Sequence, residues 1–322
     1  MLRTFRYSLL LILISGFLLI SGFLADALAA PDKRVALVIG NATYAHITAL
    51  NKPSYDARKM AEVLRSMQFD VMLVTDATKS QLEDLAQKFR AGLKGADVGF
   101  FFYSGHGFQT NRADQQHPVN HIVPVDFKVD DGNSLPATLA LDVIIDALKR
   151  EARVGFIFMD ACRSDPQLTA ASERLASGTR AVTIARGFSP INVASDRQPT
   201  ARQKSAKGPA GLLIAYATDP GNVAFEGDKG QFSPFTGSLV KHLATPGLSA
   251  AEIMGRVSAE VSTETLGQQT PWNVSSLTAG TYRFVAAPPA PIASPSSATK
   301  SGAAPARNNL PPNVGVGVGG GL

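Results

Sequence analysis

The stretch VGFIFMDACRS, residues 154–164, is an apolar run that stops at a polar turn. A second stretch, VGFFFYSGHG at residues 98–107, has the same form and ends in a histidine between two glycines. Short apolar runs rich in aromatic and β-branched residues are typical of strands buried on both faces of a parallel sheet. The two stretches therefore predict two strands of one parallel sheet.

The polar residues that follow both runs are expected at one edge of this sheet. Ligands of open parallel sheets bind beyond the carboxyl ends of the strands, where His106 and Cys162 would both emerge. Cys162 is the only cysteine in the chain, and a thiol beside an imidazole can form a nucleophile with its base. The alternatives are a buried, inert thiol and a loop histidine that caps its strand. The place of Cys162 after the apolar run, rather than inside it, favours catalysis.

Strand and helix patterns alternate along the rest of the chain. Strands are expected at 34–40, 71–74, 122–125, 212–217 and 281–285, and helices at 54–69, 80–93, 141–148, 235–243 and 250–261. Ser80 and Glu83 predict a capping box for the second helix. Residues 109–121 are polar and are expected to form a loop. The β-α-β-α-β order at the beginning is that of a doubly wound α/β sheet.

The two motifs together resemble those of the caspase–metacaspase clan. Caspases carry Gln-Ala-Cys about 50 residues after their histidine; here the separation is 162 − 106 = 56 residues, and Asp160 stands in place of the Gln, as in metacaspases. The segment Tyr103-Ser104-Gly105-His106-Gly107 is similar to the clan's histidine motif. Residues 34–284 as a whole resemble bacterial caspase-like peptidases of peptidase family C14. The resemblance implies an α/β, caspase-like fold with a mostly parallel sheet flanked by helices in a single catalytic domain.

Five segments are expected along the chain. Residues 1–30, with two arginines, a long apolar run and an Ala-x-Ala site, predict a signal peptide and an exported, periplasmic or extracellular protein. The alternative is an uncleaved inner-membrane anchor. Residues 31–165 match a caspase-like large-subunit region and 211–285 a small-subunit region, with an exposed basic connection at 166–210. Residues 286–322, rich in Pro, Ala, Ser and Gly, are expected to be disordered.

The resemblance implies a cysteine endopeptidase with a Cys-His dyad. The Cys162 thiolate would attack the scissile carbonyl to form a thioester, His106 would transfer the proton, and the N–H groups of Gly107 and Cys162 would form the oxyanion hole.

The resemblance also implies an acidic substrate pocket formed by Asp160, Ser104 and Asp56. Such a pocket predicts cleavage after Arg or Lys rather than after Asp. One alternative is that Asp160 fixes the cysteine turn through backbone hydrogen bonds. Another is that Asp56 is an early-helix aspartate favoured by the helix dipole.

No cofactor or metal is assigned from the sequence. His117 and His121 are four residues apart, but Pro118 between them argues against a shared helix face. Acidic residues at 126, 130 and 131 match no firm calcium site, so calcium activation stays open.

The expected partners are polypeptides with Arg or Lys before the scissile bond, and a membrane only if the N-terminal segment stays uncleaved. The formal net charge of +5 is dispersed, with local basic density only at 197–207 and no interleaved aromatic residues, which argues against nucleic-acid binding. Two other functions remain open: a non-catalytic caspase-like binding or scaffold protein of the cell envelope, and an unrelated doubly wound ligand-binding protein.

Overall fold

The computed structural model describes residues 32–112, 119–128, 137–162, 182–186, 210–219, 224–227, 232–278 and 282–288, with the backbone alone for 111–112, 162 and 182–186. The expected signal peptide, most of the connection at 166–210, His117 and the tail beyond 288 lie outside these ranges. The chain divides into two units, Met1–Ala287 and Pro288–Leu322, and everything below concerns the first. Within the described ranges no helix is long and apolar enough to cross a membrane.

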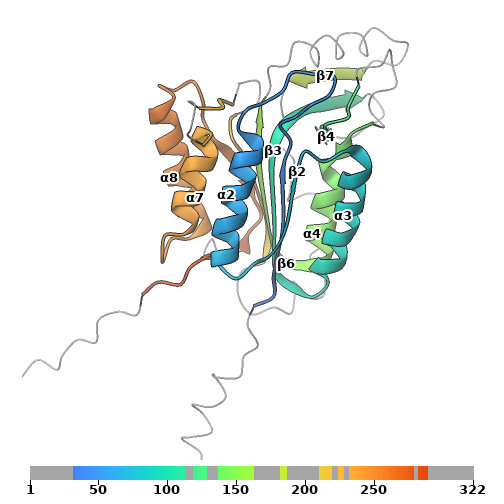
Figure 1. Ribbon diagram of the computed structural model, residues 1–322. Helices are drawn as coiled ribbons and strands as arrows, with labels where there is room; N and C mark the ends of the chain where they lie inside the picture. The colour runs from blue at the N-terminus through green and yellow to red at the C-terminus, as the bar shows by residue number, and fades with distance from the viewer. Residues whose placement is uncertain are drawn as a thin grey trace, which may run out of the picture. The chain divides into compact units, whose positions relative to one another are not determined.

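The centre of the first unit is a mostly parallel sheet with the strand order β2-β1-β3-β6-β8-β9 (Figure 1). These strands are β1 Arg34–Gly40, β2 Asp70–Thr75, β3 Ala96–Arg112, β6 Ala152–Cys162, β8 Gly211–Tyr216 and β9 Trp272–Ser275. The first five run parallel, and β9 pairs antiparallel with β8. The predicted α/β class and mostly parallel sheet are confirmed.

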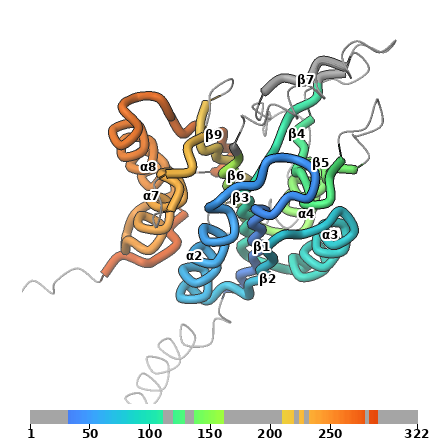
Figure 2. The backbone as a smooth tube through the Cα atoms, turned by 45° about the horizontal axis from the view of Figure 1, so that its top comes forward, coloured from blue at the N-terminus to red at the C-terminus, as the bar shows by residue number. Residues whose placement is uncertain are grey.

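Helices cover both faces of this sheet (Figures 1 and 2). One face packs against α2 Pro53–Ser66, α7 Pro234–Leu243 and α8 Ala250–Glu264, and the other against α3 Lys79–Leu93 and α4 Leu141–Glu151. Phe100 and Phe158 belong to the first core, whereas Phe101 and Ile157 belong to the second. The central strands are continuously apolar because alternate side chains enter two different cores.

The second half of β3 leaves the main sheet and forms an antiparallel extension with β4 Val119–Ile122 and β7 Val182–Arg186; β4 also pairs with β5 Leu139–Ala140. The expected loop is therefore wrong at 109–112 and 119–121, which are strand residues, and its residues 113–118 lie outside the described ranges. The strand expected at 122–125 is also wrong, because β4 ends at Ile122. Strand β4 could not be predicted from hydrophobicity because its buried side chains are polar and form hydrogen bonds with other buried polar side chains. His121 lies 2.9 Å from Thr110 Oγ1 and 2.8 Å from Thr138 Oγ1, and burial lowers the pKa of its ring to about 4.

Two further local expectations need correction. The capping box of α3 is made by Thr78 and Gln81 rather than by Ser80 and Glu83, so the N-cap lies two residues earlier than expected. In the described part of the segment expected as a closing strand, residues 282–285, the pairing is limited to an isolated bridge between Ser249 and Arg283. Its apolar alternation arises because its aromatic residues pack into the core without pairing along a strand. The short edge strand β9 was missed.

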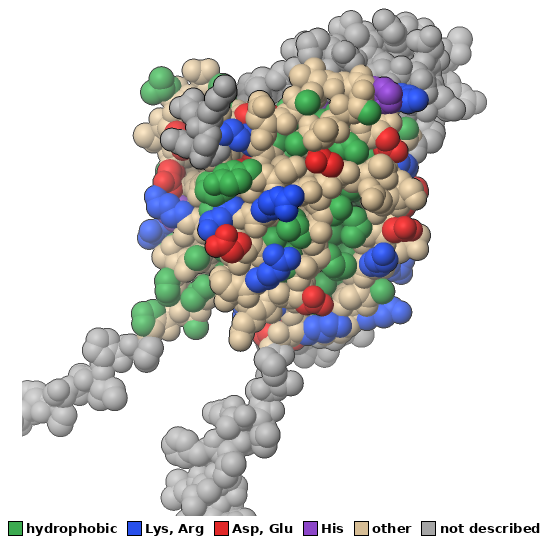
Figure 3. All heavy atoms as spheres, in the orientation of Figure 1, with side chains coloured by type: hydrophobic (Ala, Val, Ile, Leu, Met, Phe, Trp, Pro, Cys, Tyr) green, Lys and Arg blue, Asp and Glu red, His purple; other side chains and the backbone are tan. Residues whose placement is uncertain are grey.

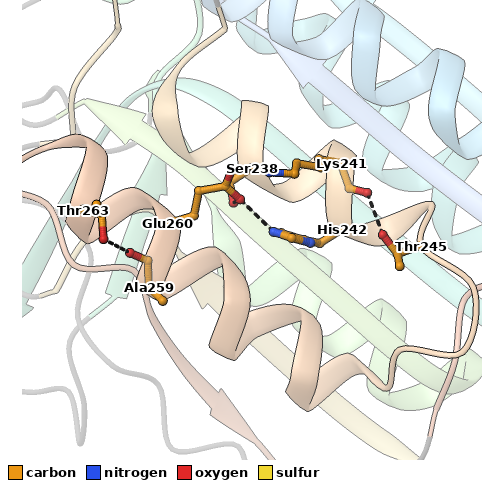
Figure 4. A network of polar contacts seen from close by, with 7 residues as sticks. All are labelled: Ser238, Lys241, His242, Thr245, Ala259, Glu260 and Thr263. Atoms are coloured by element: carbon orange, nitrogen blue, oxygen red, sulfur yellow. Dashed lines mark hydrogen bonds and ion pairs between the residues drawn. The ribbon is translucent and has the colours of Figure 1, made fainter.

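A polar network joins α7 to α8 (Figure 4). The Glu260 carboxylate of α8 accepts hydrogen bonds from Ser238 Oγ at 2.9 Å and Lys241 Nζ at 2.5 Å, and lies 2.7 Å from His242 Nε2. All three partners belong to α7. The network therefore fixes α7 against its neighbour, which matters because the other end of α7 reaches the candidate site.

Candidate active site

The site begins where β3 and β6 pass from apolar to polar residues. In the parallel ladder Ser104 is in register with Asp160, and His106 is in register with Cys162. Neighbouring strands lie about 4.8 Å apart, so the backbone of Cys162 runs directly beside His106. The Cys162 side chain lies outside the described residues.

Tyrosine hydroxyls hold the backbone on both sides of His106. The N–H of His106 donates to Tyr44 Oη at 2.8 Å, and Tyr103 Oη donates to the His106 carbonyl at 2.6 Å. Gly105 has φ +151°, and a Cβ there would lie 2.6 Å and 2.8 Å from these two hydroxyls. Only glycine fits between the tyrosines, so the glycine before the histidine is required by this packing.

The imidazole of His106 is oriented by a backbone carbonyl. His106 Nε2 lies 2.8 Å from the Thr48 carbonyl oxygen. Because a carbonyl can only accept, Nε2 carries the hydrogen, and Nδ1 is the nitrogen with the basic lone pair. The ring also contacts the Tyr44 ring at a centroid distance of 4.6 Å. Sequence reasoning missed Thr48, because a contact through the backbone leaves no mark on residue identity.

Two buried carboxylates lie close to this edge. Asp160 is 3% exposed, and Asp56, in the first turn of α2, is completely buried. Ser233, the N-cap of α7, connects them, since its N–H donates to Asp56 Oδ1 at 3.3 Å and its hydroxyl donates to Asp160 Oδ2. Thr236 Oγ1 donates to the same Asp160 oxygen at 2.6 Å.

This arrangement raises the pKa of both carboxyl groups. Burial, followed by the charge of Asp160, raises the pKa of Asp56 to about 8. Burial raises the pKa of Asp160 to about 6 against the opposing effect of the hydrogen bonds from Ser233 and Thr236. Two acidic groups so close in a buried site favour a state with fewer than two negative charges, unless a cation joins them.

Comparison with known proteins identifies the family. The profile of the caspase domain family, peptidase family C14, matches residues 33–282. The chain belongs to the caspase family.

Two curated relatives are similar to a part of this chain only. Mucosa-associated lymphoid tissue lymphoma translocation protein 1 from Homo sapiens is 32% identical over 84 residues, which are 26% of this chain and 10% of that protein. Its Mus musculus homolog is 32% identical over 80 residues, 25% of this chain and again 10% of the relative. The chain thus spans about a tenth of the length of these relatives.

A solved structure agrees with the fold. Protein GSU0716 from Geobacter sulfurreducens superposes with a TM-score of 0.54 at 18% sequence identity. The match covers 80% of this chain and all of that one.

A third carboxylate of the caspase domain acts on the buried pair. The charge of Glu226 contributes to the raised pKa of both Asp56 and Asp160. Glu226 is itself held by Asn51, whose backbone N–H and side-chain Nδ2 lie 3.2 Å and 3.1 Å from its two carboxylate oxygens. Sequence reasoning missed Glu226 because it stands in a short irregular segment without periodicity.

The remaining predicted residues occupy the expected region of the caspase domain. Ser104 is buried and in register with Asp160. Gly107 follows His106 directly and is in register with Ile122 of β4, and its role in an oxyanion hole stays a prediction. Asp160 is bonded to the start of α7, so its described partners differ from the cysteine-turn backbone considered as an alternative. Among the described residues no cluster of three or more His, Cys, Asp or Glu side chains could hold a metal ion.

Proposed function

We propose that this protein is an exported cysteine endopeptidase that cleaves polypeptides after Arg or Lys through Cys162 and His106. The observation that carries the proposal is the buried pair Asp56 and Asp160 beside the ladder position shared by His106 and Cys162. Peptide hydrolysis without a side-chain preference does not require two buried carboxylates at this position. A substrate side chain that ends in a guanidinium or ammonium group would form ion pairs with them.

The chemistry follows from the orientation of the histidine. With Nε2–H bonded to the Thr48 carbonyl, Nδ1 accepts the thiol proton, and the Cys162 thiolate attacks the scissile carbonyl. The thioester forms as the C–N bond breaks, and the imidazolium returns its proton to the leaving amine. Water then hydrolyses the thioester, with His106 as the base. Backbone N–H groups of Gly107 and Cys162 would hold the oxyanion, where the loss of one donor costs about 3–4 kcal/mol.

The acidic pocket supplies the specificity. An Asp side chain would place another negative charge beside Asp56 and Asp160, whereas Arg can pair with carboxylates through two parallel hydrogen bonds. Arg should therefore be preferred over Lys. Loss of one partner of a buried charge pair costs about 2–5 kcal/mol, so that Asp160→Ala should reduce Arg cleavage by tens- to thousands-fold.

A non-catalytic scaffold of the cell envelope is the main competing function. The paired His106 and Cys162 motifs speak against it, because a binding protein does not need them. Nucleic-acid binding has little support either. On the face seen in Figure 3, basic and acidic side chains of the described surface are interspersed, which offers no continuous basic track for a phosphate backbone.

The test is a set of fluorogenic peptides that differ only in having Arg, Lys or Asp before the scissile bond, assayed with and without calcium. Wild type should cleave the Arg and Lys peptides and leave the Asp peptide intact. Folded Cys162→Ala and His106→Ala variants should be inactive on all three. Turnover by Cys162→Ala close to that of wild type would end the peptidase hypothesis, and a preference for the Asp peptide would end the specificity assignment.

A further inference from the structure

The start of α7 gives three donors to the acidic pair. Ser233 Oγ accepts the N–H of Thr236 at 3.0 Å as a helix cap, so its own proton is available for Asp160 Oδ2. Thr236 Oγ1 donates to the same oxygen at 2.6 Å. The third donor is the Ser233 N–H, which reaches Asp56 Oδ1. Both hydroxyl-bearing residues are buried.

The donors are distributed unequally over the two carboxylates. One oxygen of Asp160 receives two hydroxyl protons, whereas Asp56 Oδ2 is buried and has no hydrogen-bond partner among the described residues. Hydroxyl groups that donate to a carboxylate favour its charged form. A buried acceptor without a donor requires an explanation, and a bound ligand that brings a donor would satisfy it.

The donors also stand on a fixed element. The far end of α7 is held by Glu260 of α8 through the network of Figure 4. Pro234 at the first helical position follows the cap directly and has a fixed φ. The hydroxyls of Ser233 and Thr236 are therefore placed by the helix rather than by a free loop.

We propose that Ser233 and Thr236 are positioning residues that orient the Asp160 carboxylate, and that Asp56 Oδ2 is the acceptor left open for the cationic end of the substrate side chain. The inference rests on the proposed function and adds a division of labour within its pocket. Asp160 contributes a fixed charge, and Asp56 contributes the unfilled acceptor. The hydroxyls act through Asp160 and need not touch the reacting atoms.

The variants Thr236→Val and Thr236→Ser test this inference in the full-length protein. Val keeps the shape and removes the hydroxyl, whereas Ser keeps the hydroxyl. Loss of a hydrogen bond to a charged group should raise KM for the Arg peptide about ten- to hundredfold, and kcat should change less than KM because the two hydroxyls act on substrate binding through Asp160. The acidic limb of kcat/KM should move to higher pH, and Thr236→Ser should restore both values to near wild type.

Ser249 provides the matched control for loss of a helix cap. It also caps a helix with its hydroxyl, which accepts the N–H of Glu252 at 3.3 Å within a capping box at the start of α8. Ser233→Ala should raise KM as Thr236→Val does, whereas Ser249→Ala should lower only the unfolding midpoint. The inference is overturned if folded Thr236→Val keeps the wild-type KM and pH profile, or if Ser249→Ala raises KM as much as Ser233→Ala.

The experiments distinguish failure of the proposed function from failure of the positioning role of Ser233 and Thr236. If wild type does not hydrolyse the Arg peptide, or if Cys162→Ala retains the activity, the proposed function falls and the inference falls with it. If wild type cleaves after Arg in a Cys162-dependent manner and Thr236→Val behaves like wild type, the inference alone is wrong.

Discussion

Replacement of Asp56 by Asn should stabilise the fold while it removes function. The pKa of this carboxyl is raised from 3.8 to about 8, first by burial and then by Asp160. Between about pH 4 and pH 8 the native state binds more protons than the unfolded state. The free energy of unfolding of wild type should therefore fall as the pH rises through this range. Asn carries no charge at any pH and should escape this loss.

The magnitude follows from the two pKa values. Their separation corresponds to about 6 kcal/mol when the group is fully ionised. Part of the rise comes from repulsion by Asp160, and that group can itself take up a proton, so we expect about 2–3 kcal/mol at pH 9. At pH 5 the Asp56 carboxyl is still protonated in the native state but already ionised in the unfolded state, so the difference between the variant and wild type should be smaller than at pH 9, about 1.5 kcal/mol.

Urea unfolding at pH 5, 7 and 9 measures this effect. The single tryptophan, Trp272 in β9, gives a fluorescence probe next to the core. Measurement in a Cys162→Ala background excludes the proposed self-cleavage as a cause of any change during unfolding. Asp84→Asn, at an exposed position of α3, is the matched control and should change nothing with pH. A stability difference for Asp56→Asn that is the same at all three pH values, or a loss of stability at pH 9, would refute the reasoning.

Three further predictions concern other parts of the molecule. Tyr44→Phe leaves the buried N–H of His106, the proposed base, without its acceptor, and kcat should fall about tenfold at constant KM; an unchanged kcat would show that this bond does not orient His106. The pKa of Glu260 is lowered to about 2, chiefly by the hydrogen bond from Lys241; Glu260→Gln should therefore cost about 1 kcal/mol of unfolding free energy above pH 5, allowing for solvent screening, and progressively less toward pH 2. Mass spectrometry should find fragments cut after basic residues of segment 164–210 in wild type and none in Cys162→Ala, and identical intact masses would argue against self-cleavage.

The order of the central strands and helices along the chain could be predicted from the sequence because the central strands are buried on both faces of the sheet. Strands β1, β3 and β6 are apolar on both faces, so their patterns show neither helical period nor alternation. The antiparallel extension of β3 could not be predicted in this way. Thr110 and His121 are buried but polar, and they are stable there only because each supplies a partner to the other. A hydrophobic pattern does not show which buried polar side chains form hydrogen bonds with each other.

The same distinction applies to the candidate site. His106 and Cys162 could be selected because each stands in the polar turn that follows an apolar run, and the pocket residues Asp160 and Asp56 followed from the family resemblance. Ser233 and Thr236 were not predicted as site residues, because their hydroxyls reach Asp160 only once α7 packs over the end of β6. Thr48 acts through its backbone. Contacts that depend on tertiary placement or on main-chain atoms leave no pattern in one sequence.

The most direct test of the account is covalent labelling of the proposed nucleophile. Purified protein is treated with two irreversible peptidyl probes that differ only in carrying Arg or Asp before the reactive group, and the labelled residue is located by peptide mass spectrometry. The account predicts that the Arg probe labels Cys162 in wild type, that folded His106→Ala is labelled far more slowly, and that the Asp probe leaves both unlabelled. Labelling of Cys162 by the Asp probe at an equal rate, or equal labelling of His106→Ala and wild type, would contradict it.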